Sequence, residues 1–162
     1  MARIHEFRSQ LAWTGSTANG YRGYDRTHRV STPPAVAELA VSADRAFRGD
    51  PDQHNPEQLL LAAASSCQLL SFLALAARDA VDVREYADDA EAIMPVGAQP
   101  MRITRVTLRP RILVAAGTDL ALVRRLVPEA HDGCFIANTL NAEFVLEPAV
   151  EHLPATAGKQ SP

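Results

Sequence analysis

One stretch of this 162-residue sequence, residues 55–79, reads NPEQLLLAAASSCQLLSFLALAARD. Asn55 is a favourable N-cap, Pro56 suits the first helical position, and Glu57 suits the positive end of a helix dipole. No Gly or Pro interrupts the residues that follow, and apolar side chains occupy most faces. The stretch therefore predicts a long helix from Pro56 to Asp79 at the centre of the fold.

The segments on either side of this helix alternate between strand and turn patterns. Before it, apolar alternation and the turn Asn19-Gly20 predict three strands, at residues 5–13, 21–30 and 39–42. After it, the same signals predict a strand region at residues 81–87 and 92–94, a strand at 101–114 with a break at Pro110, and a strand at 143–150. Two helices are expected between the last two of these, one capped by Thr118 and ended or kinked by Pro128, and one from residue 132 or 133 to 140. The order β-β-β-α-β-β-α-α-β predicts a single α+β domain over residues 1–150, followed by a flexible tail at 151–162.

Composition excludes several classes of protein. Hydrophobic residues make up 47% and charged residues 22%, which is ordinary for a globular domain. The net charge of -3 without a basic stripe argues against a nucleic-acid partner. Polar residues within the apolar run, Ser65 to Gln68 among them, favour a buried helix over a membrane span. With no secretory pattern at the N-terminus and only two cysteines, the expected compartment is the reducing cytoplasm.

The two cysteines are the main candidates for chemistry. Cys67 lies midway along the long helix, and Cys134 lies near the start of the last short helix, in His131-Asp-Gly-Cys-Phe135. A helix N-terminus lowers the pKa of a thiol, which favours a reactive Cys134. Two thiols in different environments suit a cycle through a sulfenic acid and a disulfide. Free cysteines also serve as small core residues, so position alone leaves both interpretations open.

Glu57 is a third candidate, either as a simple helix cap or as part of a site. Ten residues separate it from Cys67, about 15 Å along a helix. The two side chains cannot touch within one straight helix, so a shared site requires a bridging arginine or a second copy of the chain. A weaker alternative combines Cys134 with His131 and Asn138 in a Cys-His-Asn nucleophilic site.

Three segments together resemble the OsmC/Ohr family of peroxiredoxin-like thiol peroxidases: Asn55-Pro-Glu-Gln-Leu-Leu60, Ser65-Ser-Cys67, and His131-Asp-Gly-Cys134-Phe-Ile-Ala-Asn138. The resemblance implies an OsmC-like fold in which β-sheets wrap around a long central helix in an intertwined homodimer. It also implies reduction of organic hydroperoxides, and more weakly of hydrogen peroxide, without a cofactor or metal. An external thiol such as a dihydrolipoyl protein would be the reductant.

The resemblance also implies roles for individual residues. Cys67 would be the peroxidatic thiolate, Cys134 the resolving thiol, and Glu57 would hold an arginine over Cys67. Burial in an apolar helix raises the pKa of a thiol, so a cation is expected to be needed. The best candidates for that arginine are Arg26 and Arg48, with Arg22 and Arg45 behind them.

Two departures from the family pattern indicate a more distant branch. Phe135-Ile136 follows the second cysteine, where many Ohr-type members have proline, and Gln68 follows the first, where aromatic or other residues are often found. An apolar wall of Leu60, Leu70, Phe72 and Phe135 would suit a hydrophobic peroxide. The alternative function is that of an OsmC-fold protein that binds a small apolar ligand and keeps both thiols as non-catalytic residues.

Overall fold

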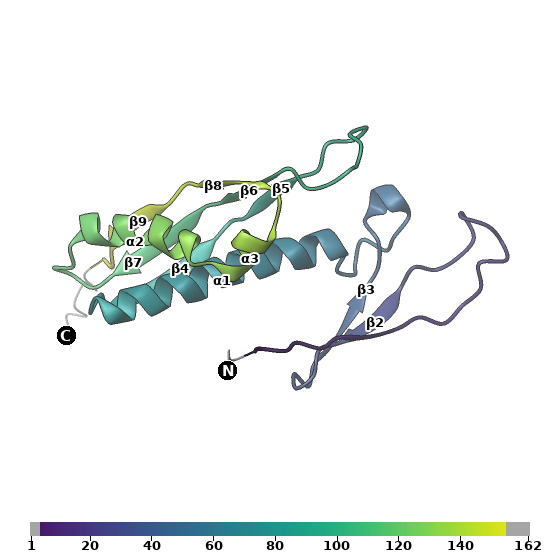
Figure 1. Ribbon diagram of the computed structural model, residues 1–162, viewed down its shortest axis with the longest axis horizontal. Helices are drawn as coiled ribbons and strands as arrows, with labels where there is room; N and C mark the ends of the chain where they lie inside the picture. Colours follow the sequence, from purple (N-terminus) through teal and green to yellow (C-terminus); the bar gives the residue numbers. More distant parts are fainter. Residues whose placement is uncertain (1–3, 155–162) are drawn as a thin grey trace, which may run out of the picture. The chain divides into compact units, whose positions relative to one another are not determined.

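The computed structural model describes residues 4–154 of the chain, which forms two compact units, Met1–Leu60 and Leu61–Pro162. The boundary falls within the long helix α1 (Pro56–Arg78), labelled in Figure 1. The predicted helix is confirmed, with its C-terminus one residue earlier than expected. The prediction of a single domain over residues 1–150 stays a prediction.

The first unit contains an antiparallel sheet of three strands in the order β1 (Gln10–Ala12), β2 (His28–Ser31) and β3 (Glu38–Val41), followed by the short helix η1 (Arg45–Phe47). All three predicted strands are present, but the first two are much shorter than predicted. The segment between β1 and β2 is held by side-chain contacts and not by strand pairing. The Trp13 indole donates to the carbonyl of Asp25 at 2.8 Å, and the ring of Tyr24 packs edge-on against those of Trp13 and Tyr21.

The start of α1 is fixed by a reciprocal pair of hydrogen bonds. The Asn55 side-chain oxygen accepts from the Gln58 N–H at 2.8 Å, and the Gln58 side-chain oxygen accepts from the Asn55 N–H at 3.1 Å. The Asn55 carbonyl accepts the first helical bond, from the N–H of Leu59. Asn55 is therefore the N-cap that the sequence predicts, and the pair forms a capping box.

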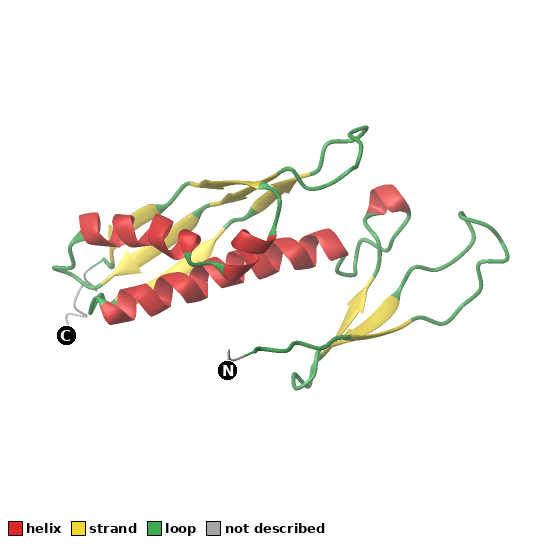
Figure 2. Ribbon diagram, viewed as in Figure 1, coloured by secondary structure: helices red, strands yellow, loops and turns green. Residues whose placement is uncertain are grey.

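The second unit combines two further helices with six strands. The helices are α2 (Leu120–Asp132) and α3 (Phe135–Thr139). The strands are β4 (Val83–Asp88), β5 (Glu91–Ile93), β6 (Arg105–Leu108), β7 (Pro110–Val114), β8 (Glu143–Leu146) and β9 (Ala149–His152). They form two ladders, β4-β7-β9 and β5-β6-β8, each with one antiparallel and one parallel pair. Figure 2 shows the helices of this unit in front of its strands.

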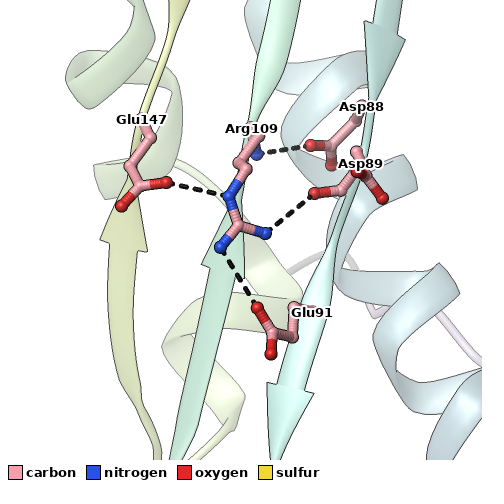
Figure 3. A network of polar contacts seen from close by, with 5 residues as sticks. All are labelled: Asp88, Asp89, Glu91, Arg109 and Glu147. Carbon is pink, nitrogen blue, oxygen red and sulfur yellow. Dashed lines mark hydrogen bonds and ion pairs between the residues drawn. The ribbon is translucent and has the colours of Figure 1, made fainter.

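Three short connections lead directly from a strand of one ladder to a strand of the other, and Arg109 forms the second of them, between β6 and β7. Its backbone N–H donates to the Asp88 carboxylate at 2.7 Å. Its guanidinium donates to Glu147 at 2.9 Å, to Glu91 at 3.1 Å and to the carbonyl of Asp89 (Figure 3). One half-exposed side chain thus links the three short connections between the two ladders.

Proline explains where two of these strands break. The strand predicted over residues 101–114 is two strands, interrupted at Arg109 just before Pro110, and its first four residues are not strand. The single strand predicted over 143–150 was wrong, because Glu147 and Pro148 separate β8 from β9. Proline cannot donate to a ladder, so the chain leaves one ladder at each of these points.

Three other expectations needed correction. The N-cap of α2 is Asp119 instead of Thr118, with its carboxylate accepting from the N–H of Ala121 at 2.8 Å. Pro128 does not end this helix, because buried residues on both sides of it, Val127 and Ala130 among them, hold the helix against the core. Strand β9 includes residues 151 and 152, which had been assigned to the flexible tail. Residues 155–162 of that tail lie outside the described part of the chain.

Only one side of α1 is buried in the single chain. Its buried residues are Ala64, Gln68, Phe72 and Ala76, spaced four apart, and the latter two belong to the core formed with α2, β7 and β9. By length and composition α1 could cross a membrane, and 22% of its most apolar window is buried. An apolar helix that was expected at the centre of the fold therefore leaves large apolar side chains, Leu70 and Leu73, exposed in the single chain.

We expect Asn55→Ala to lower the free energy of unfolding by about 1 kcal/mol, because the N–H of Gln58 loses its acceptor. Gln58→Ala removes only the return bond and should cost less. Urea unfolding of the two variants and the wild type measures both effects. An unchanged unfolding midpoint for Asn55→Ala would contradict the capping role.

Candidate functional site

Cys67 lies half-buried on α1 and lines a cavity of about 570 Å³. Leu70 and Ser71 of α1 line it from the same helix, and Phe135 lines it from α3. Phe135 is 82% exposed and Leu70 is 63% exposed, so the cavity has an apolar rim. The structure thus brings two of the four predicted wall residues to Cys67. Phe72 is fully buried in the core and cannot contribute, and Leu60 is not among the lining residues.

Cys134 is the N-cap of α3 and is only 1% exposed. Its sulfur accepts a hydrogen bond from the N–H of Ala137 at 3.4 Å, and its own N–H donates to the carbonyl of His131. Both cysteines are free thiols. Because Gly133 ends α2 and Cys134 begins α3, the turn between the two helices fixes the position of this sulfur.

The two sulfurs have opposite electrostatic environments. Partial burial acts to raise the pKa of the Cys67 thiol, but a hydrogen bond from the Cys134 thiol and others from the N–H groups of Ile136 and Phe135 outweigh it. The pKa of Cys67 therefore lies below its ordinary value. Burial raises the pKa of Cys134, and its hydrogen bond to Cys67 raises it further. Cys67 is the thiol that ionises first.

This arrangement corrects one expectation and leaves another untested. The helix N-terminus was expected to lower the pKa of Cys134. The N–H groups of Ala137 and Ile136 do act in that direction, but burial and the neighbouring Cys67 raise the pKa by more. A cation was expected to be needed to ionise Cys67. In the single chain, neutral donors lower the pKa of the half-buried Cys67 thiol, and the role of an arginine beside it stays a prediction.

A second cavity, of about 610 Å³, lies within the first unit and is lined by both Arg26 and Glu57. The Arg26 guanidinium donates to the carbonyls of Tyr24 at 2.9 Å and Tyr21 at 2.7 Å. It also stacks on both rings, 4.0 Å from the centroid of Tyr24 and 4.8 Å from that of Tyr21. Trp13 completes this aromatic wall. Within the described residues no ion pair joins Arg26 to Glu57, so the carboxylate does not hold the arginine in the single chain.

The other candidate arginines do not line either cavity. Arg48 is exposed, at the C-cap of η1 with a positive φ of 66°. Arg22 and Arg45 are also exposed. The aromatic residues that hold Arg26 were missed by sequence reasoning, although the pattern Tyr21-x-x-Tyr24-x-Arg26 was a signal for stacking on a guanidinium.

The Cys-His-Asn arrangement does not form. The His131 ring packs against that of Phe144, with centroids 4.9 Å apart, and its Nδ1 is buried without a partner in the described structure. The Asn138 side chain donates to the carbonyl of Asp132 at 2.9 Å. Neither side chain is hydrogen-bonded to the Cys134 sulfur. Across residues 4–154, no cluster of three His, Cys, Asp or Glu side chains is arranged to hold a metal ion.

Solved structures define the class of fold to which these two sites belong. An OsmC-like protein of unknown function from Vibrio cholerae superposes with a TM-score of 0.81 at 26% identity, over 90% of this chain and 100% of that one. A protein from Legionella pneumophila described as an organic hydroperoxide resistance protein OsmC superposes with a TM-score of 0.69 at 18% identity, over 93% and 99%. The fold is OsmC-like, with mixed α and β structure.

Sequence comparison assigns the family. The chain belongs to the OsmC-like protein family, whose model matches residues 49–148. The uncharacterized protein YmaD of Bacillus subtilis is 25% identical over 117 residues, which are 69% of this chain and 78% of that protein. The resemblance drawn from the NPEQLL and cysteine motifs is therefore confirmed.

We expect Cys67 to be alkylated at lower pH than Cys134, because the pKa of Cys67 is lowered and that of Cys134 is raised. Cys134→Ala removes the thiol donor, so the pKa of Cys67 should rise in that variant. Mass spectrometry after iodoacetamide labelling across a pH series resolves the two sites. Preferential labelling of Cys134 at low pH would contradict the assignment.

Proposed function

We propose that this protein is a thiol-dependent peroxidase that reduces organic hydroperoxides through Cys67. The observation that carries the proposal is the position of Cys67, half-buried at a cavity whose rim includes Phe135 at the start of α3. The lowered pKa of its thiol there favours the thiolate. The thiolate is the nucleophile in cysteine chemistry. Hydroperoxide resistance in the name of the Legionella protein supports the same class of reaction.

The proposed cycle has three steps. The Cys67 thiolate attacks the terminal oxygen of the hydroperoxide, the O–O bond breaks, and the alkoxide takes a proton to leave as an alcohol. Cys67 is now a sulfenic acid, and the Cys134 sulfur displaces its hydroxyl as water to form a disulfide. An external dithiol, such as a dihydrolipoyl protein, returns two electrons and two protons. The raised pKa of Cys134 fits the later role, since this thiol stays protonated while Cys67 attacks.

We further propose that the active site is completed by a second copy of the chain. Arg26 and Glu57 line one cavity and Cys67 lines another, and Glu57 and Cys67 are ten residues apart on one straight helix. The uncovered apolar surface of α1, including Leu70 and Leu73, supports burial against a partner. In an intertwined homodimer, Arg26 of one copy would polarise the peroxide held over Cys67 of the other, and Glu57 would orient that arginine.

One equivalent of cumene hydroperoxide should convert both thiols to an intramolecular disulfide, because the Cys134 thiol is a hydrogen-bond partner of the sulfur that becomes oxidised. In Cys134→Ser a sulfenic acid on Cys67 should accumulate, and Cys67→Ser should not react. Intact mass with and without a sulfenic-acid trap gives the readout. Two thiols that survive unchanged would overturn the peroxidase and favour binding of a small apolar ligand in the cavity beside Cys67.

Mixing inactive variants tests the shared site. Arg26→Ala should lower the peroxidase rate roughly 100- to 1,000-fold by removing the charge that stabilises the leaving oxygen. Arg48→Ala, an exposed arginine outside both cavities, is the matched control and should retain activity. When Arg26→Ala is exchanged with Cys67→Ser, half of the dimers combine the two chains and each carries one intact site, so roughly a quarter of the wild-type activity should return. No recovery after subunit exchange, or a monomeric mass in sedimentation, would refute the shared site.

A further inference from the structure

Gln68 is a polar residue in a position that otherwise takes apolar ones. It follows Cys67 directly and is 1% exposed. It belongs to the buried stripe of α1 whose other members are Ala64, Phe72 and Ala76. The stripe faces the rest of the second unit. The Gln68 side chain therefore lies on the buried face of α1, next to the half-buried Cys67.

The amide of Gln68 ties α1 to α2. Its Nε2 donates to the carbonyl of Val127 at 3.0 Å, inside the protein. Its Oε1 is buried and has no partner within the described residues. A buried amide with an unsatisfied oxygen is less favourable for stability than an apolar side chain of the same size. The contribution of Gln68 is therefore better explained by what it positions than by stability alone.

The tie acts on the helix that leads to Cys134. Val127 lies five residues before Asp132, the last residue of α2, about 7.5 Å along the helix axis, and the helix continues through Pro128 to that point. Only Gly133 separates α2 from the Cys134 cap of α3. A helix transmits the position of one residue to another along its axis, so fixing the Val127 carbonyl fixes the turn that carries the Cys134 sulfur.

We propose that Gln68 is a positioning residue that holds the Cys134 thiol against the Cys67 sulfur by anchoring α2 to α1. Where the proposed peroxidase function holds, Gln68 sets how readily Cys134 captures the Cys67 sulfenic acid. It acts through the two helices and touches no reacting atom. Gln68, which departs from the family pattern, thus acts in the second step of the cycle, the formation of the disulfide.

A second tie on the same helix provides the control. The Ser65 hydroxyl donates to the carboxylate of Asp88, at the end of β4, which also accepts the backbone N–H of Arg109. This bond anchors α1 to the strands and not to α2. Ser65→Ala therefore removes one polar anchor of α1 within two residues of Cys67 without releasing the Cys134 turn.

The test compares Gln68→Met with Ser65→Ala. Methionine keeps the length and approximate volume of glutamine and lacks the donor. Gln68→Met should weaken the hydrogen bond from Cys134 and raise the pKa of Cys67 by roughly half to one unit, the equivalent of one net hydrogen bond. The equilibrium constant for the Cys67–Cys134 disulfide against a dithiothreitol buffer should fall roughly two- to tenfold. Ser65→Ala should leave both quantities at wild-type values, even if its melting temperature falls.

Two further measurements keep the outcomes distinct. Gln68→Asn retains an amide but is too short to reach Val127, so it should reproduce both shifts if Gln68→Met fails to fold. The pKa comparison, followed by thiolate absorbance, needs neither peroxide nor disulfide formation. Wild-type protein that is inert to cumene hydroperoxide would therefore refute the peroxidase while the pKa comparison still decides the role of Gln68. Unchanged pKa of Cys67 in folded Gln68→Met or Gln68→Asn, or equal shifts in Ser65→Ala, would overturn the inference.

Discussion

The burial of one face of α1 determines where Cys67, its partners in α3 and the neighbouring cavity lie. Residues spaced four apart place Ala64, Gln68, Phe72 and Ala76 under the helix. Cys67 is the neighbour of one of them, so it must lie at the border between the buried and uncovered faces. That border position gives the thiol partners in α3 on one side and access to a cavity on the other. If the buried residues of α1 were shifted by one position along the sequence, the Cys67 sulfur would be either buried in the core or exposed to water away from the donors of α3.

Much of this arrangement could be predicted from sequence, because it depends on local signals. The Asn55 cap, the length of α1 and the two candidate cysteines all follow from residue types at fixed spacings. The predictions that failed depend on contacts between residues that are far apart in the sequence. The pKa order of the two cysteines depends on which sulfur the backbone of α3 faces, and the length of the early strands depends on aromatic packing across a loop. The break at Glu147 and Pro148 is a local signal, since a proline within a run of this kind argues against one continuous strand.

The two cavities provide different kinds of electrostatic stabilisation: neutral hydrogen-bond donors in one and a guanidinium in the other. Beside Cys67, neutral N–H and S–H donors lower the thiol pKa, an effect that salt screens weakly because it acts at hydrogen-bond distance. In the other cavity, Arg26 is already satisfied by two carbonyls and two rings. A guanidinium held in this way keeps its charge and some of its donors for a ligand, and it loses little freedom on binding one. The thiolate is thus prepared within one unit, and the proposed role of the arginine is confined to the transition state.

The capping of α3 by a sulfur atom couples chemistry to local folding. A helix of five residues has little intrinsic stability, and the acceptor at its N-cap is Cys134. A change in the electron density of that sulfur changes the strength of the bond from Ala137. The amide of Ala137 is consequently a reporter of the oxidation state of Cys134, and its rate of hydrogen exchange would differ between the reduced and oxidised protein. In this short segment, the sulfur atom that is oxidised is also the acceptor that stabilises the first turn of the helix.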